Sequence, residues 1–365
     1  MNTADPRAAR RPRPGADLSY PFPAPSTDGA VVEVAPGVLW VRMPMPMALD
    51  HINVWLLRGD TGWTIVDTGL ATEQTKALWE HIVAHHLDGL PVEALVCTHF
   101  HYDHAGLASW ITERFGVPLY MTLAEFFTMR VLEGAMTDPP PPEQVEFYAR
   151  AGLPAERTAR LFDALRRDPF MPPRQGQYRR LRDGDVLKIG SRRWRVLVGE
   201  GHSPEHACLY CAEDRLLIGG DQLLPRISSN VLVSSFEPDA NPLALWLRSL
   251  DRLDTCAPDT LVLPSHQSVF RGLHARVQEL REHHRHQFDL LHRFVAERVE
   301  CTAFEAMGAL FPRLRGAGDD ILALGETLAH LAWLREDGVL QRRLAEDGTW
   351  RHALVATTDD AEIHW

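Results

Sequence analysis

Four side chains of the kinds that bind metal ions lie close together in the sequence. His99, His101, Asp103 and His104 follow the apolar run 94–97 and precede a helical pattern. A loop between a buried strand and a helix is a usual place for functional side chains. On such a loop the first two histidines can point one way while the aspartate and the last histidine turn to a second point. The spacing therefore predicts a metal site with more than one centre.

Three further candidates each come at the end of an apolar, strand-like run. They are His202, Asp221 and His266. A strand end holds a ligand rigidly, and the glycine before Asp221 lets the backbone approach an ion closely. One tetrahedral ion uses about four ligands, so these candidates, added to the first four, predict two ions.

The order of these motifs resembles that of the metallo-β-lactamase-fold hydrolase superfamily. The match extends from about Val31 to Arg285 and comprises VDTG at 66–69, THxHxDH at 98–104, GHSPxH at 201–206, GGD at 219–221 and PSH at 264–266. One departure is Ser265, where the family usually has glycine. Serine can serve there if its backbone φ is ordinary.

The resemblance implies an α/β fold, namely a four-layer αβ/βα sandwich with a glyoxalase II-like core and the metals at one edge. It also implies a ligand set: His99, His101 and His202 for the first ion, Asp103, His104 and His266 for the second, and Asp221 bridging both. Asp103 would also orient the nucleophile or deliver a proton to the leaving group. Asp67 would support the ligand loop through hydrogen bonds, and His206 and Tyr210 are candidate donors to the substrate.

Two divalent ions held in this way would bind a bridging hydroxide and polarise the substrate. We expect zinc, with iron or manganese as alternatives. The predicted reaction is hydrolysis of a small thioester, lactone or other ester. Two alternatives stay open: a phosphodiesterase or endoribonuclease, and a non-catalytic metal-binding protein.

The elements that must position these ligands alternate between strands and helices from about residue 31. Between about 123 and 178 a helical insertion with several prolines interrupts the pattern. We expect it to be a lid over the site. Its side chains could line an apolar pocket and meet an acidic substrate group: Phe126, Phe127, Met129, Phe147, Tyr148 and Phe162, with Arg130, Arg150, Arg166 and Arg167.

The predicted domains are a disordered tail at 1–30, a catalytic domain at 31–298 and a winged-helix-like domain at 299–365. Helices are predicted at 303–311, 321–324 and 325–337, followed by a hairpin of 339–344 and 350–355. Winged-helix-like tails accompany lactamase-β-like endoribonucleases. However, residues 301–358 contain eight acidic and six basic residues, whereas a nucleic-acid reader is usually basic. We therefore expect a docking module or one that supports a homodimer.

Composition limits the partners. The formal net charge is −11, which disfavours nucleic acid and anionic membranes and leaves a small-molecule substrate. Cys208 and Cys211 form a CxxC, but residues three apart on a strand point to opposite faces, so we expect packing rather than a metal site. No apolar segment follows the early arginines, and the five cysteines are an odd number. We therefore expect reduced thiols and a cytoplasmic location.

Overall fold

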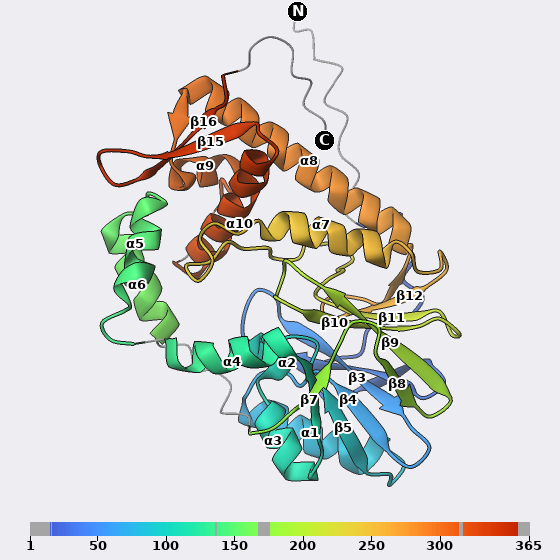
Figure 1. The fold of residues 1–365 in the computed structure, drawn as a ribbon. Coiled ribbons are helices and arrows are strands. Elements are labelled where there is room, and N and C mark those ends of the chain that lie inside the picture. The colour runs from blue at the N-terminus through green and yellow to red at the C-terminus, as the bar shows by residue number, and fades with distance from the viewer. Residues whose placement is uncertain (1–14, 16, 136, 167–175, 314–316, 357–365) are drawn as a thin grey trace, which may run out of the picture.

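The computed structural model describes residues 15, 17–135, 137–166, 176–313 and 317–356. Two β-sheets pack face to face, and helices cover the outer face of each sheet (Figure 1). This is the predicted α/β sandwich of four layers. A smaller unit, formed by the last part of the chain, adjoins the helices that cover the second sheet.

The first sheet contains seven strands in chain order. They are β1 (Val31–Ala35), β2 (Val38–Pro44), β3 (His51–Arg58), β4 (Trp63–Val66), β5 (Val92–Val96), β6 (Leu119–Thr122) and β7 (Arg179–Leu181). β1 to β4 are antiparallel, and β4 to β7 are parallel. Parallel neighbours need crossover connections, and α1 (Glu73–His86) and α3 (Ala108–Phe115) provide two of them.

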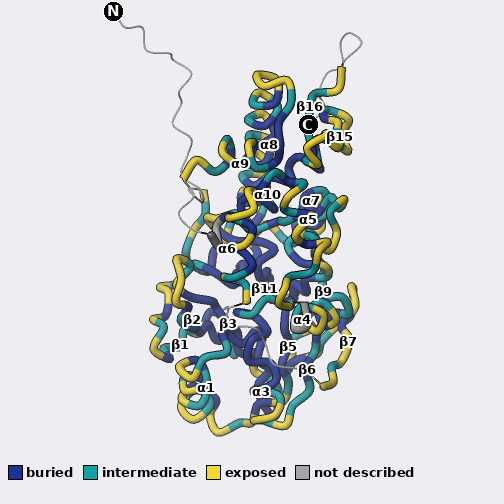
Figure 2. The backbone as a smooth tube through the Cα atoms, turned by 90° about the vertical axis from the view of Figure 1, so that its left-hand side faces the viewer, coloured by how far each residue is buried: buried dark blue, intermediate teal, exposed yellow. Residues whose placement is uncertain are grey.

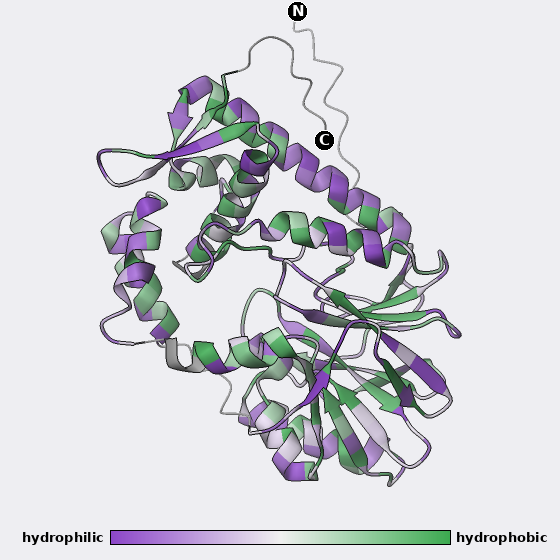
Figure 3. Cartoon of the chain, viewed as in Figure 1, coloured by the Kyte–Doolittle hydropathy of each residue, from purple (hydrophilic) through white to green (hydrophobic). Residues whose placement is uncertain are grey.

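The second sheet has the order β13-β12-β11-β10-β9-β8. Its strands are β8 (Val186–Ile189), β9 (Arg192–Gly199), β10 (His206–Cys211), β11 (Leu216–Gly220), β12 (Leu261–Pro264) and β13 (Phe270–Arg271). β11 and β12 are parallel, and α7 (Pro242–Leu253) forms their crossover. The long α8 (Leu273–Arg298) lies beside α7 and presents many hydrophilic residues outward (Figure 3).

Apolar side chains on the strands point alternately to the two faces of each sheet, and they form three layers of apolar packing. On β3, Trp55 and Leu57 face the space between the sheets, whereas Val54 and Leu56 face the core beneath α1 and α3. Successive strand residues point to opposite faces, so a strand covered on both sides is apolar at every position. Figure 2 shows that the central strands, such as β3, are buried along most of their length.

The insertion contains three described helices, α4 (Leu123–Ala135), α5 (Pro142–Arg150) and α6 (Ala155–Arg166). Residues 136 and 167–175, including Arg167, lie outside the described residues. Only α4 lies beside the predicted ligands; α5 and α6 pack on the C-terminal unit, where the rings of Phe147 and Trp350 are 6.0 Å apart. The expectation that the whole insertion covers the site was therefore wrong for α5 and α6.

The C-terminal unit is a small domain with a winged-helix-like arrangement. It contains β14 (Glu300–Cys301), α9 (Ala303–Leu310), α10 (Ala317–Glu336), β15 (Leu340–Leu344) and β16 (Trp350–Leu354). β15 and β16 form the predicted hairpin, and β14 pairs with β16. The two helices predicted at 321–337 are one continuous helix, because Gly325 packs closely on Leu232 and does not end the helix.

The segment from residue 17 to residue 30 was expected to belong to a disordered tail, and this was wrong. Ser19 exchanges backbone hydrogen bonds with Arg271 on β13. Leu18, Tyr20 and Phe22 pack against the core, so apolar side chains between the prolines hold the segment in place.

All five cysteines are free and buried. Cys208 belongs to the core under α7 and Cys211 to the core between the sheets, so the CxxC pair points to opposite faces as predicted. In the part of the chain that the structure describes, no helix is long and apolar enough to cross a membrane.

Candidate metal centre

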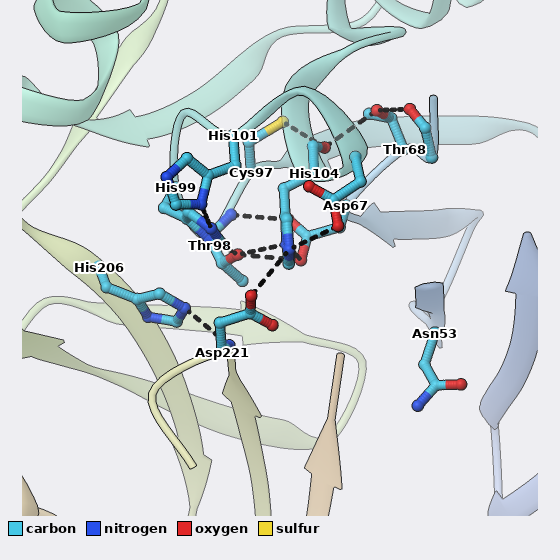
Figure 4. A network of polar contacts seen from close by, with 12 residues as sticks. Asn53, Asp67, Thr68, Cys97, Thr98, His99, His101, His104, His206 and Asp221 are labelled. Carbon is cyan, nitrogen blue, oxygen red and sulfur yellow. Dashed lines mark hydrogen bonds and ion pairs between the residues drawn. The ribbon is translucent and has the colours of Figure 1, made fainter. Parts of the chain in front are cut away.

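The seven predicted ligands meet at one edge of the sandwich, between the two sheets. β4 runs parallel to β5, and β11 runs parallel to β12, so their carboxyl ends open at the same edge. Two backbone hydrogen bonds join the sheets there: Ala207 N–H donates to Thr98 at 2.8 Å, and Asn53 N–H donates to Ser265 at 2.6 Å. The strand ends thus bring ligands from four distant segments together. Figure 4 shows two of these segments, with Asp221 facing the loop of His99, His101 and His104.

The ligand atoms form two groups. One contains His99, His101, His202 and Asp221, the other contains Asp103, His104 and His266, and the atoms within each group lie within 4.8 Å of one another. Asp221 faces both groups: its carboxylate oxygens lie 3.5 Å from His202 Nε2, 3.6 Å from His104 Nε2 and 3.4 Å from His266 Nε2. This is the division that the resemblance implied, with Asp221 between the two halves.

Hydrogen bonds outside the two groups fix how the imidazoles point. Nδ1 of His202 contacts the carbonyl of Asn230 at 2.8 Å, and Nδ1 of His266 contacts the carbonyl of His51 at 2.8 Å. Nδ1 of His104 lies 2.8 Å from the Asp67 carboxylate. Each contact directs Nε2 into the site, the arrangement in which an imidazole binds a metal.

Charges within the site are unbalanced when no cation is considered. Burial lowers the pKa of His99 well below its usual value and that of His101 to about 3. Burial also opposes the charge on His266, but the Asp221 and Asp103 carboxylates raise its pKa to about 10. No described lysine or arginine forms an ion pair with either carboxylate. The acidic groups are thus balanced only by protons on imidazole, or by metal ions in their place.

The residues fit divalent metal ions. His104 Nε2 and Asp221 Oδ1 are buried and lack a hydrogen-bond partner among the described residues, although both point to the centre of the site. Buried polar atoms normally have partners, and imidazole with carboxylate is a donor set of zinc and related ions. A cation between the two groups would satisfy both atoms.

Two predicted substrate donors do not reach the site. His206 is fully buried, and its Nε2 accepts a hydrogen bond from the backbone N–H of Asp221 at 3.1 Å. Tyr210 lies on β10 and its hydroxyl accepts from Ala257 N–H at 3.1 Å. His206 therefore supports a ligand, and Tyr210 is part of the packing under α7.

Ser265 does not have a positive φ, so serine fits at this position, where the family usually has glycine.

Glu125 on α4 is a functional candidate that the sequence did not single out. Its buried carboxylate accepts hydrogen bonds from Phe100 N–H at 3.0 Å, the Ser203 hydroxyl at 2.6 Å and Glu205 N–H at 2.7 Å. It thereby joins the loop of His99 and His101 to the loop of His202. A lone glutamate in a helical pattern gives no sign of burial, so only the structure identifies it.

A cavity of about 570 Å³ opens beside His101 and His202. The three described arginines that were expected to meet the substrate do not line it. Arg150 pairs with Glu146, Arg166 pairs with Asp138, and Arg130 lies over the ring of Phe126. Of the aromatic residues expected there, Phe127 lines the cavity.

Comparison of the chain with known protein families identifies the family to which it belongs. A model of the metallo-beta-lactamase superfamily matches residues 47–266, and a model of the metallo-beta-lactamase-like C-terminal domain matches residues 291–355. The chain belongs to the metallo-β-lactamase superfamily. It is a metallo-hydrolase, and members of this superfamily typically bind divalent metals.

Two solved structures share the fold over most of the chain. A beta-lactamase domain protein from Burkholderia ambifaria is 44% identical with a TM-score of 0.87, and the match covers 93% of this chain and 99% of that one. A metallo-beta-lactamase family protein from Thermus thermophilus is 30% identical with a TM-score of 0.74, and the match covers 88% of this chain and 100% of that one.

Two curated relatives are more distant. Probable metallo-hydrolase YqjP of Bacillus subtilis is 28% identical over 302 residues, which covers 80% of this chain and 91% of that protein. Acyl-coenzyme A thioesterase MBLAC2 of Bos taurus is 28% identical over 194 residues, which covers 51% of this chain and 63% of that protein.

Proposed function

We propose that this metallo-hydrolase holds two ions and hydrolyses a small thioester, lactone or other ester. The observation that carries the proposal is the position of Asp221 between two groups of ligands, each large enough to hold an ion. His99, His101 and His202 would hold the first ion and Asp103, His104 and His266 the second, with zinc preferred over iron or manganese. When bound, such ions lower the pKa of water and polarise a carbonyl oxygen.

The chain's own residues complete the chemistry. Asp103 Oδ2 lies 3.4 Å from His266 Nε2 and 3.5 Å from His104 Nε2, facing the centre of the site. From there it orients the attacking water and returns a proton to the leaving thiolate or alkoxide. Asp67, Thr98 and Glu125 keep the ligand loops in position.

Support for an acyl substrate comes from the cavity and from a relative. No lysine or arginine appears among the described residues that line the cavity, so a long polyanion finds no phosphate partners there. One relative is named an acyl-coenzyme A thioesterase. These observations favour a small ester or thioester over RNA. A homodimer and a cytoplasmic location stay predictions, which sedimentation and fractionation test.

Metal content and turnover test the proposal together. Elemental analysis of metal-saturated protein should give two ions per chain, and Asp221→Ala should lose both metal and turnover of an acyl-thioester and lactone panel. Cys208→Ala, a buried change in the neighbouring core, should keep both. One ion per chain would contradict the dinuclear site.

Metal-dependent cleavage of single-stranded RNA that falls steeply with salt would favour the nuclease instead, because each phosphate contact adds about 0.7 to the slope of log affinity against log salt. Metal binding without turnover of any member of the panel would contradict the proposed substrate class.

A further inference from the structure

One face of α4 forms a wall of the cavity beside the metal ligands. The residues that line it are Ala124, Phe127, Thr128, Val131 and Leu132, whose spacing of three and four positions is that of one helix face. The wall extends from Ala124 to Leu132, which is eight steps along the helix, or about 12 Å at 1.5 Å per step. Figure 3 shows that much of α4 is hydrophobic.

The opposite wall comes from the segment before α7 and from the start of α7. Leu232, Phe236, Ala240, Pro242 and Leu245 line it, and Phe100 and the 201–204 loop close the end nearest the ligands. Both walls are therefore mainly apolar, and together they form a groove rather than a closed chamber.

Three of the large apolar side chains that the structure leaves exposed border this groove. Phe127 is 53% exposed, Val131 is 58% exposed and Phe236 is 53% exposed. A contiguous apolar surface in a concave site marks a place where an apolar ligand binds. Among the described residues that line the groove, Glu237 is the only one with a carboxylate, and none is a lysine or arginine. The groove therefore suits a neutral apolar chain and repels an anionic one.

The groove has a direction because α4 begins at the ligands. Glu125 binds the Phe100 and Ser203 segments, and Ala124 N–H donates to Glu205 at 2.9 Å. Leu132, two turns further on, lies at the far end of the helix face. A ligand whose reactive carbon is at His101 and His202 would extend from there towards Leu132.

We propose that this groove holds the unbranched acyl chain of a thioester or ester substrate, with its carbonyl at the ligands and its thiol or alcohol part outside. This rests on the proposed function and deepens it by naming the substrate class. An extended chain matches a groove that follows one face of a helix over about 12 Å. A compact acyl group would leave Phe127, Val131 and Phe236 exposed.

The test uses neutral N-acetylcysteamine thioesters of acetyl, hexanoyl and decanoyl groups, so that only chain length changes. Burying a methylene contributes about 0.8 kcal/mol, roughly fourfold in kcat/KM. Because the groove is partly open to solvent, each methylene should contribute only part of this free energy. We therefore expect kcat/KM for the decanoyl thioester to exceed that for the acetyl thioester by at least about 100-fold. Ala240→Trp should abolish the dependence of kcat/KM on chain length, and its circular dichroism spectrum should match that of wild type, which shows that the variant folds. Ala84→Trp, an exposed position on α1, should behave as wild type.

A binding measurement distinguishes the proposed acyl groove from the proposed hydrolytic function. The decyl thioether of N-acetylcysteamine cannot be hydrolysed, and calorimetry should show that it binds wild type more tightly than the ethyl thioether does. Ala240→Trp should remove that difference. If no thioester is hydrolysed but this binding pattern holds, the groove stands and the proposed function fails. If thioesters are hydrolysed with no preference for length, or if the decyl thioether binds no better than the ethyl one, the acyl groove is wrong.

Discussion

Asp67 holds the ligand loop although it belongs to neither group of ligands. Its carboxylate accepts hydrogen bonds from the backbone N–H of Thr98 at 2.8 Å and from the Thr98 hydroxyl at 2.9 Å, and it lies 2.8 Å from His104 Nδ1. It also has a positive φ of 64°, a conformation that asparagine tolerates better than most residues. Asp67→Asn therefore removes the charge with little strain on the backbone.

We expect Asp67→Asn to lower metal affinity by about 10- to 100-fold, because the group that orients a ligating imidazole contributes on that scale. Competition with a chelator measures the affinity, and circular dichroism checks the fold. Asp88→Asn is the matched control, since Asp88 also has a positive φ of 53° but pairs with Arg58 on the surface. Equal affinities in the two variants would show that Asp67 does not support the site.

Glu125 is the second buried carboxylate beside the ligands. Burial raises its pKa from 4.5 to about 7, while the Ser203 hydroxyl and the backbone N–H groups of Glu205 and Phe100 act in the opposite direction. Between pH 4.5 and 7 the unfolded chain ionises this carboxyl and the folded protein retains its proton. The stability that the raised pKa provides is therefore present below pH 4.5 and is lost as the pH rises through 7.

Glu125→Gln should remove this pH dependence. Urea unfolding of both proteins in matched buffers should show the wild type losing up to about 3 kcal/mol relative to the variant from pH 4.5 to pH 7. Glu80→Gln, at an exposed carboxylate paired with Arg114, is the surface control. Parallel curves for wild type and Glu125→Gln would mean that the buried carboxyl does not titrate in this range.

At the scale of elements, the end of β11 explains why the chain needs a glycine directly before Asp221. A Cβ on Gly220 would lie 2.3 Å from the His206 ring, and its φ is +54°. A Cβ on Gly219 would make only ordinary contacts, the nearest being Val262 at 3.6 Å. The His206 ring thus occupies the space beside Gly220, and from there it accepts the hydrogen bond of Asp221.

Gly220→Ala and Gly219→Ala should therefore differ although the residues are adjacent. Gly220→Ala displaces His206, so we expect a loss of about 1–3 kcal/mol in the free energy of unfolding and at least about a 10-fold loss of metal affinity. Gly219→Ala should remain near wild type in both measurements. Similar losses in both variants would contradict the close packing of His206 against β11.

The ligands at the strand ends were predictable from the sequence, because each apolar run ends in a residue of a metal-binding type. In the structure all seven candidates lie in one site. Which face a residue occupies was harder to predict. His206 is the last residue of the GHSPxH motif and Tyr210 comes four residues later, yet β10 turns both away from the substrate side. The continuity of α10 was missed because Gly325 resembles a helix end. The roles of the insertion's arginines depend on tertiary contacts that no local pattern shows.

At the scale of the whole molecule, the C-terminal domain contacts one wall of the groove directly and packs on the helices that follow α4, which forms the other wall. Val233 N–H donates to the carbonyl of Gly325 at 3.1 Å, and Asn241 donates to Glu336 at 2.8 Å. On the other side, Arg157 of α6 pairs with Asp320, and Phe304 N–H donates to the carbonyl of Ala151 at 3.0 Å. The domain thus contacts the segment before α7 and the helices that follow α4.

The contact between α10 and the groove can be changed at a single glycine. A Cβ on Gly325 would lie 3.0 Å and 3.1 Å from atoms of Leu232 and 3.2 Å from the carbonyl oxygen of Val233. Valine at this position must push the groove wall away from α10, because the atoms it meets include backbone. On α9, a Cβ on Gly308 would have no atom within 4 Å apart from its chain neighbours and its own helix backbone, so Gly308→Val is a helical control without this contact.

We expect Gly325→Val to lower kcat/KM for a decanoyl thioester by about 10-fold or more, on the scale of the 1–3 kcal/mol that overpacking costs. Acetyl thioester turnover and metal content should change little, because the wall moves and the ligands do not. Gly308→Val should leave kcat/KM for both substrates near wild type. If Gly325→Val reduces acetyl and decanoyl turnover equally, or if the two glycine variants behave alike, the C-terminal domain does not shape the groove and contributes to general stability instead.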